Sequence, residues 1–168
     1  MASAQPTVLV PTVEAVRAVL DEVCDPEIPI LTIADLGVLR DVRIEAQRVT
    51  VVITPTYSGC PAMHAIEQDI RAALAAAGYH DVNVETALAP AWSTDHLSAA
   101  AHAKLRSVGI APPAHGTKDK RALLGREVAC PRCASQQTER ISEFGSTACK
   151  ALYRCRNCLE PFDYFKCL

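Results

Sequence analysis

Hydrophobic and polar positions in the first two thirds of the chain follow two different periods. Apolar side chains three and four residues apart predict amphipathic helices over residues 12–24, 61–77 and 93–108. Alternating or β-branched runs predict strands over residues 38–44, 49–54 and 82–84. The order helix, strand, strand, helix, strand, helix predicts a small α+β domain over residues 11–110.

Capping residues support these boundaries. Thr12 is a suitable N-cap for the first helix, and Pro26 and Pro29 prevent that helix from continuing. Pro61 and Gly78 frame the second helix, which matches the preference for proline in the first turn and glycine just past the last. The short connection between the first two strands predicts a hairpin.

The last third of the chain has a different composition. Residues 111–125 hold prolines, a glycine and a basic run, which predicts a linker. Residues 126–168 are too few to fold around an apolar core without a cross-link or a metal. The net charge is −2, but acidic residues dominate before residue 117 and basic residues after it. This asymmetry also favours two modules.

Six of the eight cysteines lie in this C-terminal segment. Cys130 and Cys133 form one CxxC pair, and Cys155 and Cys158 form a second pair after 21 intervening residues. Two such pairs are typical of a tetrahedral zinc site, so residues 126–168 are predicted to form a β zinc ribbon. Iron in the same geometry and four buried free cysteines are the alternatives. Four thiolates leave no open coordination position, which favours a structural ion.

Two further cysteines of this segment have no assigned partner. Cys149 and Cys167 could each be a buried small side chain, an alternate ligand or a redox thiol. We expect strands on either side of the second CxxC pair, over residues 138–144 and 161–166.

Cys60 stands alone at the start of the second predicted helix. The helix dipole and free N–H groups at that position favour a thiolate. An inert thiol buried under the helix is the alternative interpretation. Asp25 and Glu27 follow the first helix on a turn stiffened by proline, and they could serve as ligands or remain solvated loop carboxylates.

Several classes of protein are excluded or disfavoured. No apolar run approaches the roughly 18 residues of a membrane span, and no signal peptide begins the chain. We therefore expect a cytoplasmic protein, in which reduced thiols bind metal instead of forming disulfides. No dinucleotide, phosphate-loop, hydrolase or metalloprotease motif is present, which favours a non-catalytic role. The modest basic excess of the ribbon argues against nucleic acid as a partner.

Several motifs resemble those of known families. Four segments carry the first resemblance: Asp25-Pro26-Glu27-Ile28-Pro29, Asp35-Leu36-Gly37, residues 54–62 and residues 90–95. They are similar to the metal–sulfur cluster assembly (SufT-like) domain, whose members act in iron–sulfur protein maturation. A ribbon with the sequences of residues 144–150 and 161–167 resembles the D components of bacterial phenylacetyl-CoA epoxidase systems. The resemblance covers residues 11–167.

The resemblance implies specific roles. Cys60 matches the reactive cysteine of the assembly family, and Asp25 and Glu27 match its acidic turn. In such systems a di-iron subunit epoxidises phenylacetyl-CoA with electrons from a reductase. This chain has no flavin motif and no Glu-x-x-His helix pair for a di-iron site. We therefore expect a maturation factor for iron or iron–sulfur centres of the oxygenase or the reductase, with Cys60 as a transient ligand and the ribbon as a docking module.

Two other roles stay open at this point. The chain could be a structural subunit that remains bound to the oxygenase, or a thiol oxidoreductase that uses Cys149 or Cys167. A cluster bridged between two Cys60 thiolates would favour a homodimer. The sequence does not determine the type of cluster or which component receives it.

Overall fold

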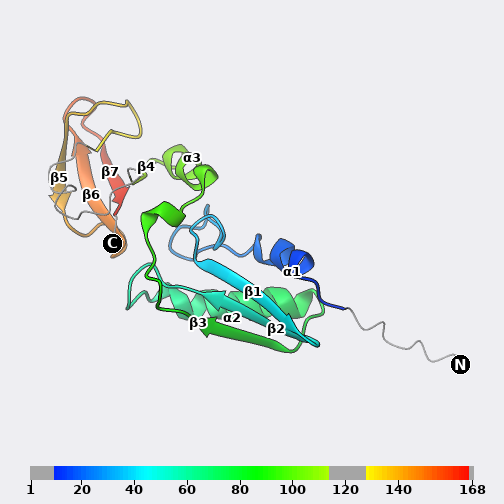
Figure 1. The fold of residues 1–168 in the computed structure, drawn as a ribbon. Helices are drawn as coiled ribbons and strands as arrows, with labels where there is room; N and C mark the ends of the chain where they lie inside the picture. Colours follow the sequence, from blue (N-terminus) through cyan, green and yellow to red (C-terminus); the bar gives the residue numbers. More distant parts are fainter. Residues whose placement is uncertain (1–9, 114–127, 167–168) are drawn as a thin grey trace, which may run out of the picture.

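A three-stranded sheet forms the centre of the N-terminal half in the computed structural model, which describes residues 10–113 and 128–166 (Figure 1). Its strands, in the order β1-β2-β3, are β1 (Leu39–Glu45), β2 (Arg48–Ile53) and β3 (Val82–Thr86). Strands β1 and β2 form the predicted antiparallel hairpin. Strand β3 runs parallel to β2, because helix α2 (Ala62–Ala76) provides the crossover between them.

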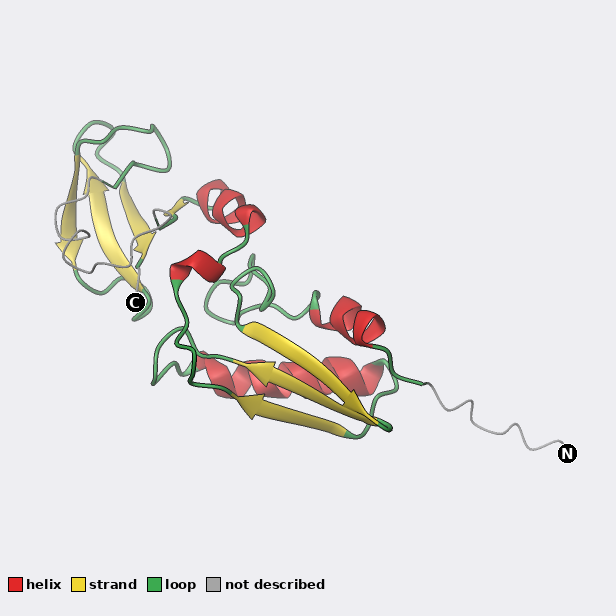
Figure 2. Cartoon of the chain, viewed as in Figure 1, coloured by secondary structure: helices red, strands yellow, loops and turns green. Residues whose placement is uncertain are grey.

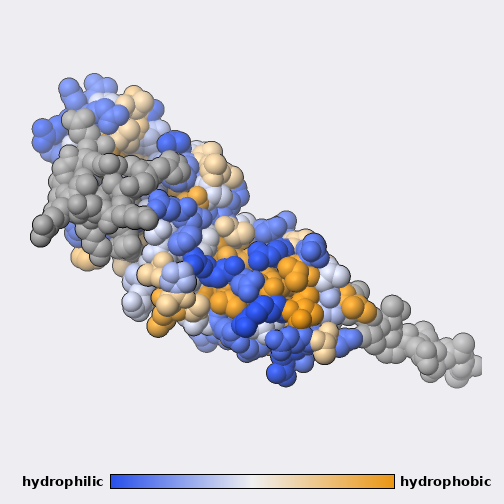
Figure 3. Space-filling model, in the orientation of Figure 1, coloured by the Kyte–Doolittle hydropathy of each residue, from blue (hydrophilic) through white to orange (hydrophobic). Residues whose placement is uncertain are grey.

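The core lies on the side of the sheet that α2 and helix α1 (Val13–Leu20) cover. Val42 and Val51 are paired across the hairpin, and both are buried against the helices. The other side carries ion pairs such as that between Arg43 and Glu85. On the face turned to the viewer, Figure 3 shows apolar side chains next to strongly hydrophilic ones. The sheet is therefore half-buried, as its alternating pattern requires.

Helix α1 is shorter than predicted, because it ends at Leu20 and not near residue 24. The N–H of Ile33 donates to the carbonyl of Val23, and the N–H of Asp25 donates to the carbonyl of Leu31, both at 2.9 Å. These bonds to a later segment take the backbone groups that a longer helix would have used. The acidic turn is thereby fixed to the body of the domain.

The third predicted helix is interrupted. A single 3-10 turn, η1 (Thr94–His96), is separated from helix α3 (Ala99–Ser107) by extended backbone at Leu97 and Ser98. The N–H of Ser98 donates to the carbonyl of Asp35 at 2.9 Å, and its hydroxyl caps α3 at Ala101. A capping serine in the middle of an apolar pattern starts a new helix.

The C-terminal half is a four-stranded sheet in the order β4-β7-β6-β5 (Figure 2). Its strands are β4 (Ile110–Ala111), β5 (Thr138–Ser142), β6 (Lys150–Cys155) and β7 (Pro161–Phe165). Strand β6 was not predicted from the sequence, although its neighbours β5 and β7 were. Ala111, expected to begin the linker, instead lies in β4, which pairs in parallel with β7. Residues 114–125 of the predicted linker lie outside the described residues.

The two sheets share part of their core. Phe165 at the end of β7 and Cys149 just before β6 are buried in the same cluster as the N-terminal helices and strands. The Phe165 ring meets Trp92 edge-on, with ring centroids 6.2 Å apart. The α+β class predicted from the sequence is confirmed, with a compact N-terminal unit followed by a small β unit that packs against it.

The segment that carries Trp92 packs closely against Gly37. Gly37 has a positive φ of 65°, and a Cβ placed there would lie 2.5 Å from the Cβ of His96. The indole N–H of Trp92 donates to the carbonyl of Leu36 at 2.8 Å. The carboxylate of Asp35 accepts a hydrogen bond from Ser98 and pairs with Lys104 of α3. The Asp35-Leu36-Gly37 motif is therefore an anchor for residues 92–104.

Replacing Gly37 by alanine should destabilise the protein through backbone strain and through the clash with His96. We expect Gly37→Ala to lower the free energy of unfolding by about 2–4 kcal/mol. Gly78 is a matched control, because its φ is 92° but nothing lies within 4 Å of an added Cβ. Gly78→Ala should therefore lose only about 1 kcal/mol. Urea unfolding measures both values, and equal losses would contradict a role for the His96 contact.

None of the helices in residues 10–113 and 128–166 combines the length and the apolar composition of a membrane span.

Candidate metal centres

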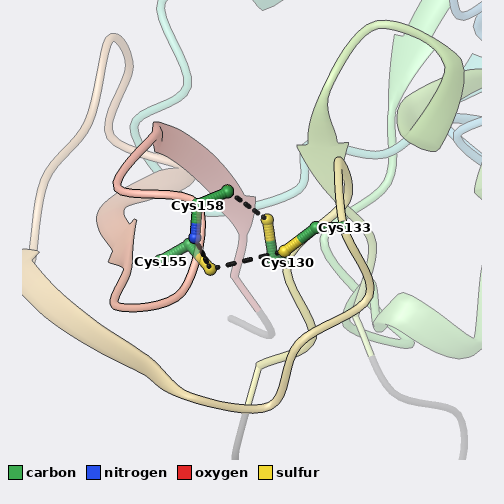
Figure 4. Close-up of side chains that lie close together, drawn as sticks. All are labelled: Cys130, Cys133, Cys155 and Cys158. Atoms are coloured by element: carbon green, nitrogen blue, oxygen red, sulfur yellow. Dashed lines mark hydrogen bonds between the residues drawn. The ribbon is translucent and has the colours of Figure 1, made fainter.

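The four cysteines of the two CxxC pairs converge at one end of the second sheet (Figure 4). Their sulfur atoms all lie within 4.8 Å of one another, with Cys130 and Cys158 at 3.8 Å and Cys133 and Cys155 at 3.6 Å. A tetrahedral ion with metal–sulfur bonds of about 2.3 Å requires sulfur–sulfur distances of about 3.8 Å. The cysteines are therefore already spaced as ligands of one tetrahedral ion.

Backbone N–H groups of the second CxxC pair donate hydrogen bonds to the sulfur of Cys155. The backbone N–H of Cys158 donates to Cys155 Sγ at 3.4 Å, and that of Asn157 does the same at 3.4 Å. These donors, with that of Cys158 the strongest, lower the pKa of the Cys155 thiol to about 6 against the effect of desolvation. The lowered pKa favours metal binding at Cys155, because the thiolate is the form of cysteine that binds metal.

The acidic turn is held by one of its own carboxylates. Asp25 is buried, and its Oδ1 accepts the backbone N–H groups of Glu27 and Ile28, each at 2.8 Å. Burial raises the pKa of Asp25, although these two N–H groups and the charge of Lys150 lower it. Asp25 is thus not the solvated loop carboxylate of the alternative interpretation. Its side chain shapes the turn that presents Glu27, which is half-buried.

Cys60 lies half-buried directly before α2, and Pro61 is the N-cap of that helix. Desolvation raises the pKa of its thiol, and the nearby carboxylates of Glu27 and Asp25 raise it further. The backbone N–H of Ala62 lowers the pKa but does not outweigh them. The N–H group at the helix N-terminus thus favours the thiolate, as expected, but it is outweighed. Burial and negative charge dominate at this position.

Cys149 lies near the same carboxylates, although it belongs to the second sheet. Its Sγ–H donates to Glu27 Oε2 at 3.8 Å, and its side chain is buried. Desolvation raises the pKa of the Cys149 thiol, and Glu27 and Asp25 contribute to that shift. Cys60, the acidic turn and Cys149 therefore share one environment. Cys167, the other unassigned cysteine, lies outside the described residues.

Two polar residues at this place were missed by the sequence analysis. The pKa of the Tyr57 hydroxyl is raised by desolvation and then by Cys60, Glu27 and Cys149, which puts Tyr57 within electrostatic reach of all three. Lys150 is buried and acts electrostatically on Asp25 and Cys149. The position of Tyr57 three residues before Cys60 could have singled it out, but no local signal marks Lys150.

Family models match both halves of the chain. Residues 13–86 match a model described as iron–sulfur cluster assembly protein, and residues 114–166 match the PaaD zinc beta ribbon domain. A crystal structure of a domain of unknown function, DUF59, from Bacillus anthracis is 27% identical with a TM-score of 0.52, covering 55% of this chain and 90% of that one. These matches define an iron–sulfur cluster assembly domain joined to a zinc ribbon. They confirm the predicted ribbon with its metal-binding cysteine cluster.

Sequence similarity to two named proteins identifies the particular family. A putative 1,2-phenylacetyl-CoA epoxidase component of Escherichia coli is 51% identical over 96% of this chain and 97% of its own length. An Fe–S protein maturation auxiliary factor of Porphyromonas gingivalis is 35% identical, covering 52% of this chain and 84% of its own length. The chain belongs to the PaaD-like family, as the sequence motifs indicated.

Removal of one ribbon ligand should release the metal and loosen the second sheet. Cys133 is exposed, so Cys133→Ser removes a ligand without disturbing buried packing. We expect loss of about one equivalent of metal and at least about tenfold faster amide hydrogen exchange in β6. Elemental analysis and exchange mass spectrometry measure these effects. Cys24→Ser is the matched control, because Cys24 is also exposed but lies outside the cluster. Full metal content in Cys133→Ser would argue against the four-sulfur site.

The raised thiol pKa values predict a loss of stability at alkaline pH. A group whose pKa is raised by folding stabilises the protein below its unfolded pKa, here 9.0, and this contribution disappears as the pH rises through the folded value. The free energy of unfolding should therefore fall above about pH 9, and it should fall less in Cys60→Ser. Urea unfolding at several pH values, with metal supplied to the ribbon site alone, measures the slope. An identical slope in wild type and variant would contradict the raised pKa of Cys60.

Proposed function

We propose that this chain is a non-catalytic maturation factor for the iron or iron–sulfur centres of a phenylacetyl-CoA epoxidase system. The observation that carries the proposal is the place of Cys60, whose thiol lies within electrostatic reach of Glu27 and Asp25 beside the ribbon. The family and its iron–sulfur assembly domain support an accessory role in phenylacetate degradation. The name of the Porphyromonas relative supports a role in maturation.

The chemistry around Cys60 and the acidic turn suits a carrier of iron. Cys60 provides a soft thiolate, and the acidic turn provides hard oxygen donors, a combination that iron accepts. The surroundings keep the thiol protonated at neutral pH, so metal must displace a proton to bind there. Binding is thereby weakened in comparison with the ribbon site. A carrier needs such a site because it must give up its iron to the recipient.

The ribbon would serve as a docking module stabilised by Zn²⁺. Its sulfur–sulfur distances of 3.6 and 3.8 Å suit a tetrahedral ion, and four thiolates leave no position for substrate. The recipient would be the oxygenase or the reductase component of the same system, in the cytoplasm. A homodimer that shares one cluster between two Cys60 thiolates is compatible with the half-buried position of that residue.

Maturation in cells tests this role directly. In cells that produce Cys60→Ser in place of the wild-type chain, we expect the iron content of the recipient to fall at least about fivefold, because its carrier lacks the thiolate that holds iron. The oxygenase and reductase are purified separately and their iron is measured, so the deficient component identifies the recipient. Cys24→Ser should leave the iron content unchanged.

Other outcomes would support other roles. Fully loaded components whose activity still requires the chain would indicate a structural subunit of the oxygenase. Turnover with a dithiol substrate would indicate a thiol oxidoreductase. Either result would overturn the maturation role.

A further inference from the structure

The position of Cys149 is not explained by the ribbon site. The metal-binding cluster at the other end of the sheet consists of Cys130, Cys133, Cys155 and Cys158. Cys149 instead lies at the opposite end of β6 and faces the N-terminal unit. Only 5% of its side chain is exposed, and the hydroxyl of Thr147 contacts its sulfur at 3.0 Å. The ribbon thus places a thiol in the shared core of the two units.

The distance from this thiol to the acidic turn fits a shared metal ion. Cys149 Sγ lies 3.8 Å from Glu27 Oε2. A tetrahedral ion with bonds of about 2.3 Å to sulfur and about 2.1 Å to a carboxylate oxygen holds those two atoms about 3.6 Å apart. The two donors therefore need a shift of only a few tenths of an ångström to bind the same ion.

Cys60 belongs to the N-terminal unit and packs against the same core cluster as Cys149. Glu27 acts electrostatically on both thiols, and Tyr57 is acted on by Cys60, Glu27 and Cys149 together. In the described part of the chain, the ribbon cysteines alone form a group whose ligand atoms all lie within 4.8 Å. Cys60 must therefore move toward the other two donors to share an ion. It follows Gly59, around which an added Cβ would meet only open space.

We propose that Cys149 of the ribbon, Cys60 and Glu27 form one composite site for Fe²⁺ between the two units. This inference rests on the proposed function and adds a second thiolate to it. Each thiol loses its proton to solvent as its sulfur binds the ion. Asp25 does not bind metal but holds Glu27 in place through the bonds to its own turn. Lys150 supplies positive charge beside three negative ligands.

The composite site gives the ribbon a second task. A ribbon that only docks on a recipient has no need of a buried thiol at its contact with the assembly domain. With Cys149 as a ligand, the same module that meets the recipient also completes the iron site. Two thiolates and a carboxylate leave one tetrahedral position open, through which a ligand of the recipient can enter.

Metal titration of the full chain with its ribbon metal in place tests the proposal. Co²⁺ and then Fe²⁺ are added without oxygen, and the thiolate-to-metal charge-transfer absorption is recorded. Its intensity rises with the number of bound thiolates. Wild type should give the two-thiolate intensity. Cys149→Ser and Cys60→Ser should each lose about half of it and bind at least about tenfold more weakly. Cys24→Ser should match wild type.

Controls separate a lost ligand from a damaged fold. Cys149→Ala keeps a small buried side chain without the sulfur, and it should show the same loss as Cys149→Ser. Both variants must retain the ribbon metal and a cooperative unfolding transition. Glu27→Gln should weaken binding while the charge-transfer intensity at saturation stays at the two-thiolate level, because both sulfurs remain.

The results distinguish the two proposals. Wild-type intensity and affinity in both Cys149 variants, together with a loss in Cys60→Ser, would overturn the composite site and leave the carrier role of Cys60 intact. A loss in the Cys149 variants with normal iron in the recipient components of Cys60→Ser cells would support the composite site and overturn the maturation role. Wild-type protein that binds neither ion beyond the ribbon site would also overturn the composite site.

Discussion

The edge-on contact between Phe165 and Trp92 determines how the two halves of this protein meet. Trp92 is itself fixed by its hydrogen bond to Leu36, next to the glycine that His96 approaches. Phe165 ends β7, and the following N–H, that of Lys166, donates to the carbonyl of Cys149 at 2.9 Å. The aromatic contact therefore positions the backbone of Cys149, and through it the thiol beside the acidic turn.

The ribbon cysteines and the pair Cys60 and Cys149 lie in two different kinds of surroundings. In the ribbon, Cys155 sits on a tight turn whose N–H groups donate to its sulfur, which lowers the cost of forming its thiolate. Cys60 and Cys149 are desolvated and lie near the carboxylates of Glu27 and Asp25, and both effects increase that cost. The first arrangement suits an ion that stays for the life of the protein. The second suits an ion that leaves. The two groups of thiols differ because each thiol responds to its immediate neighbours.

Local signals predicted the elements that local interactions determine. Proline and glycine marked α2 well, and the CxxC spacing identified the ribbon cysteines. The end of α1 depends on bonds from residues 23 and 25 to residues 31 and 33, which no helical pattern contains. Strand β6 was missed because Lys150, Ala151, Leu152 and Arg154 have little preference for strands, and pairing with both neighbours overrides that preference. The contact of Cys149 with Glu27 joins residues 122 positions apart, so it follows only from the tertiary packing.

The pairing of β4 with β7 has a consequence for how the chain can be divided. Strand β4 follows α3 directly, yet its hydrogen bonds complete the second sheet. A fragment that starts at residue 114, where the ribbon family model begins, would leave β7 as an unprotected edge. A fragment that stops before β4 would leave Trp92 without Phe165. The boundary of the ribbon family model therefore does not coincide with the boundary of the second sheet, and a ribbon exchanged between relatives would have to carry β4 with it.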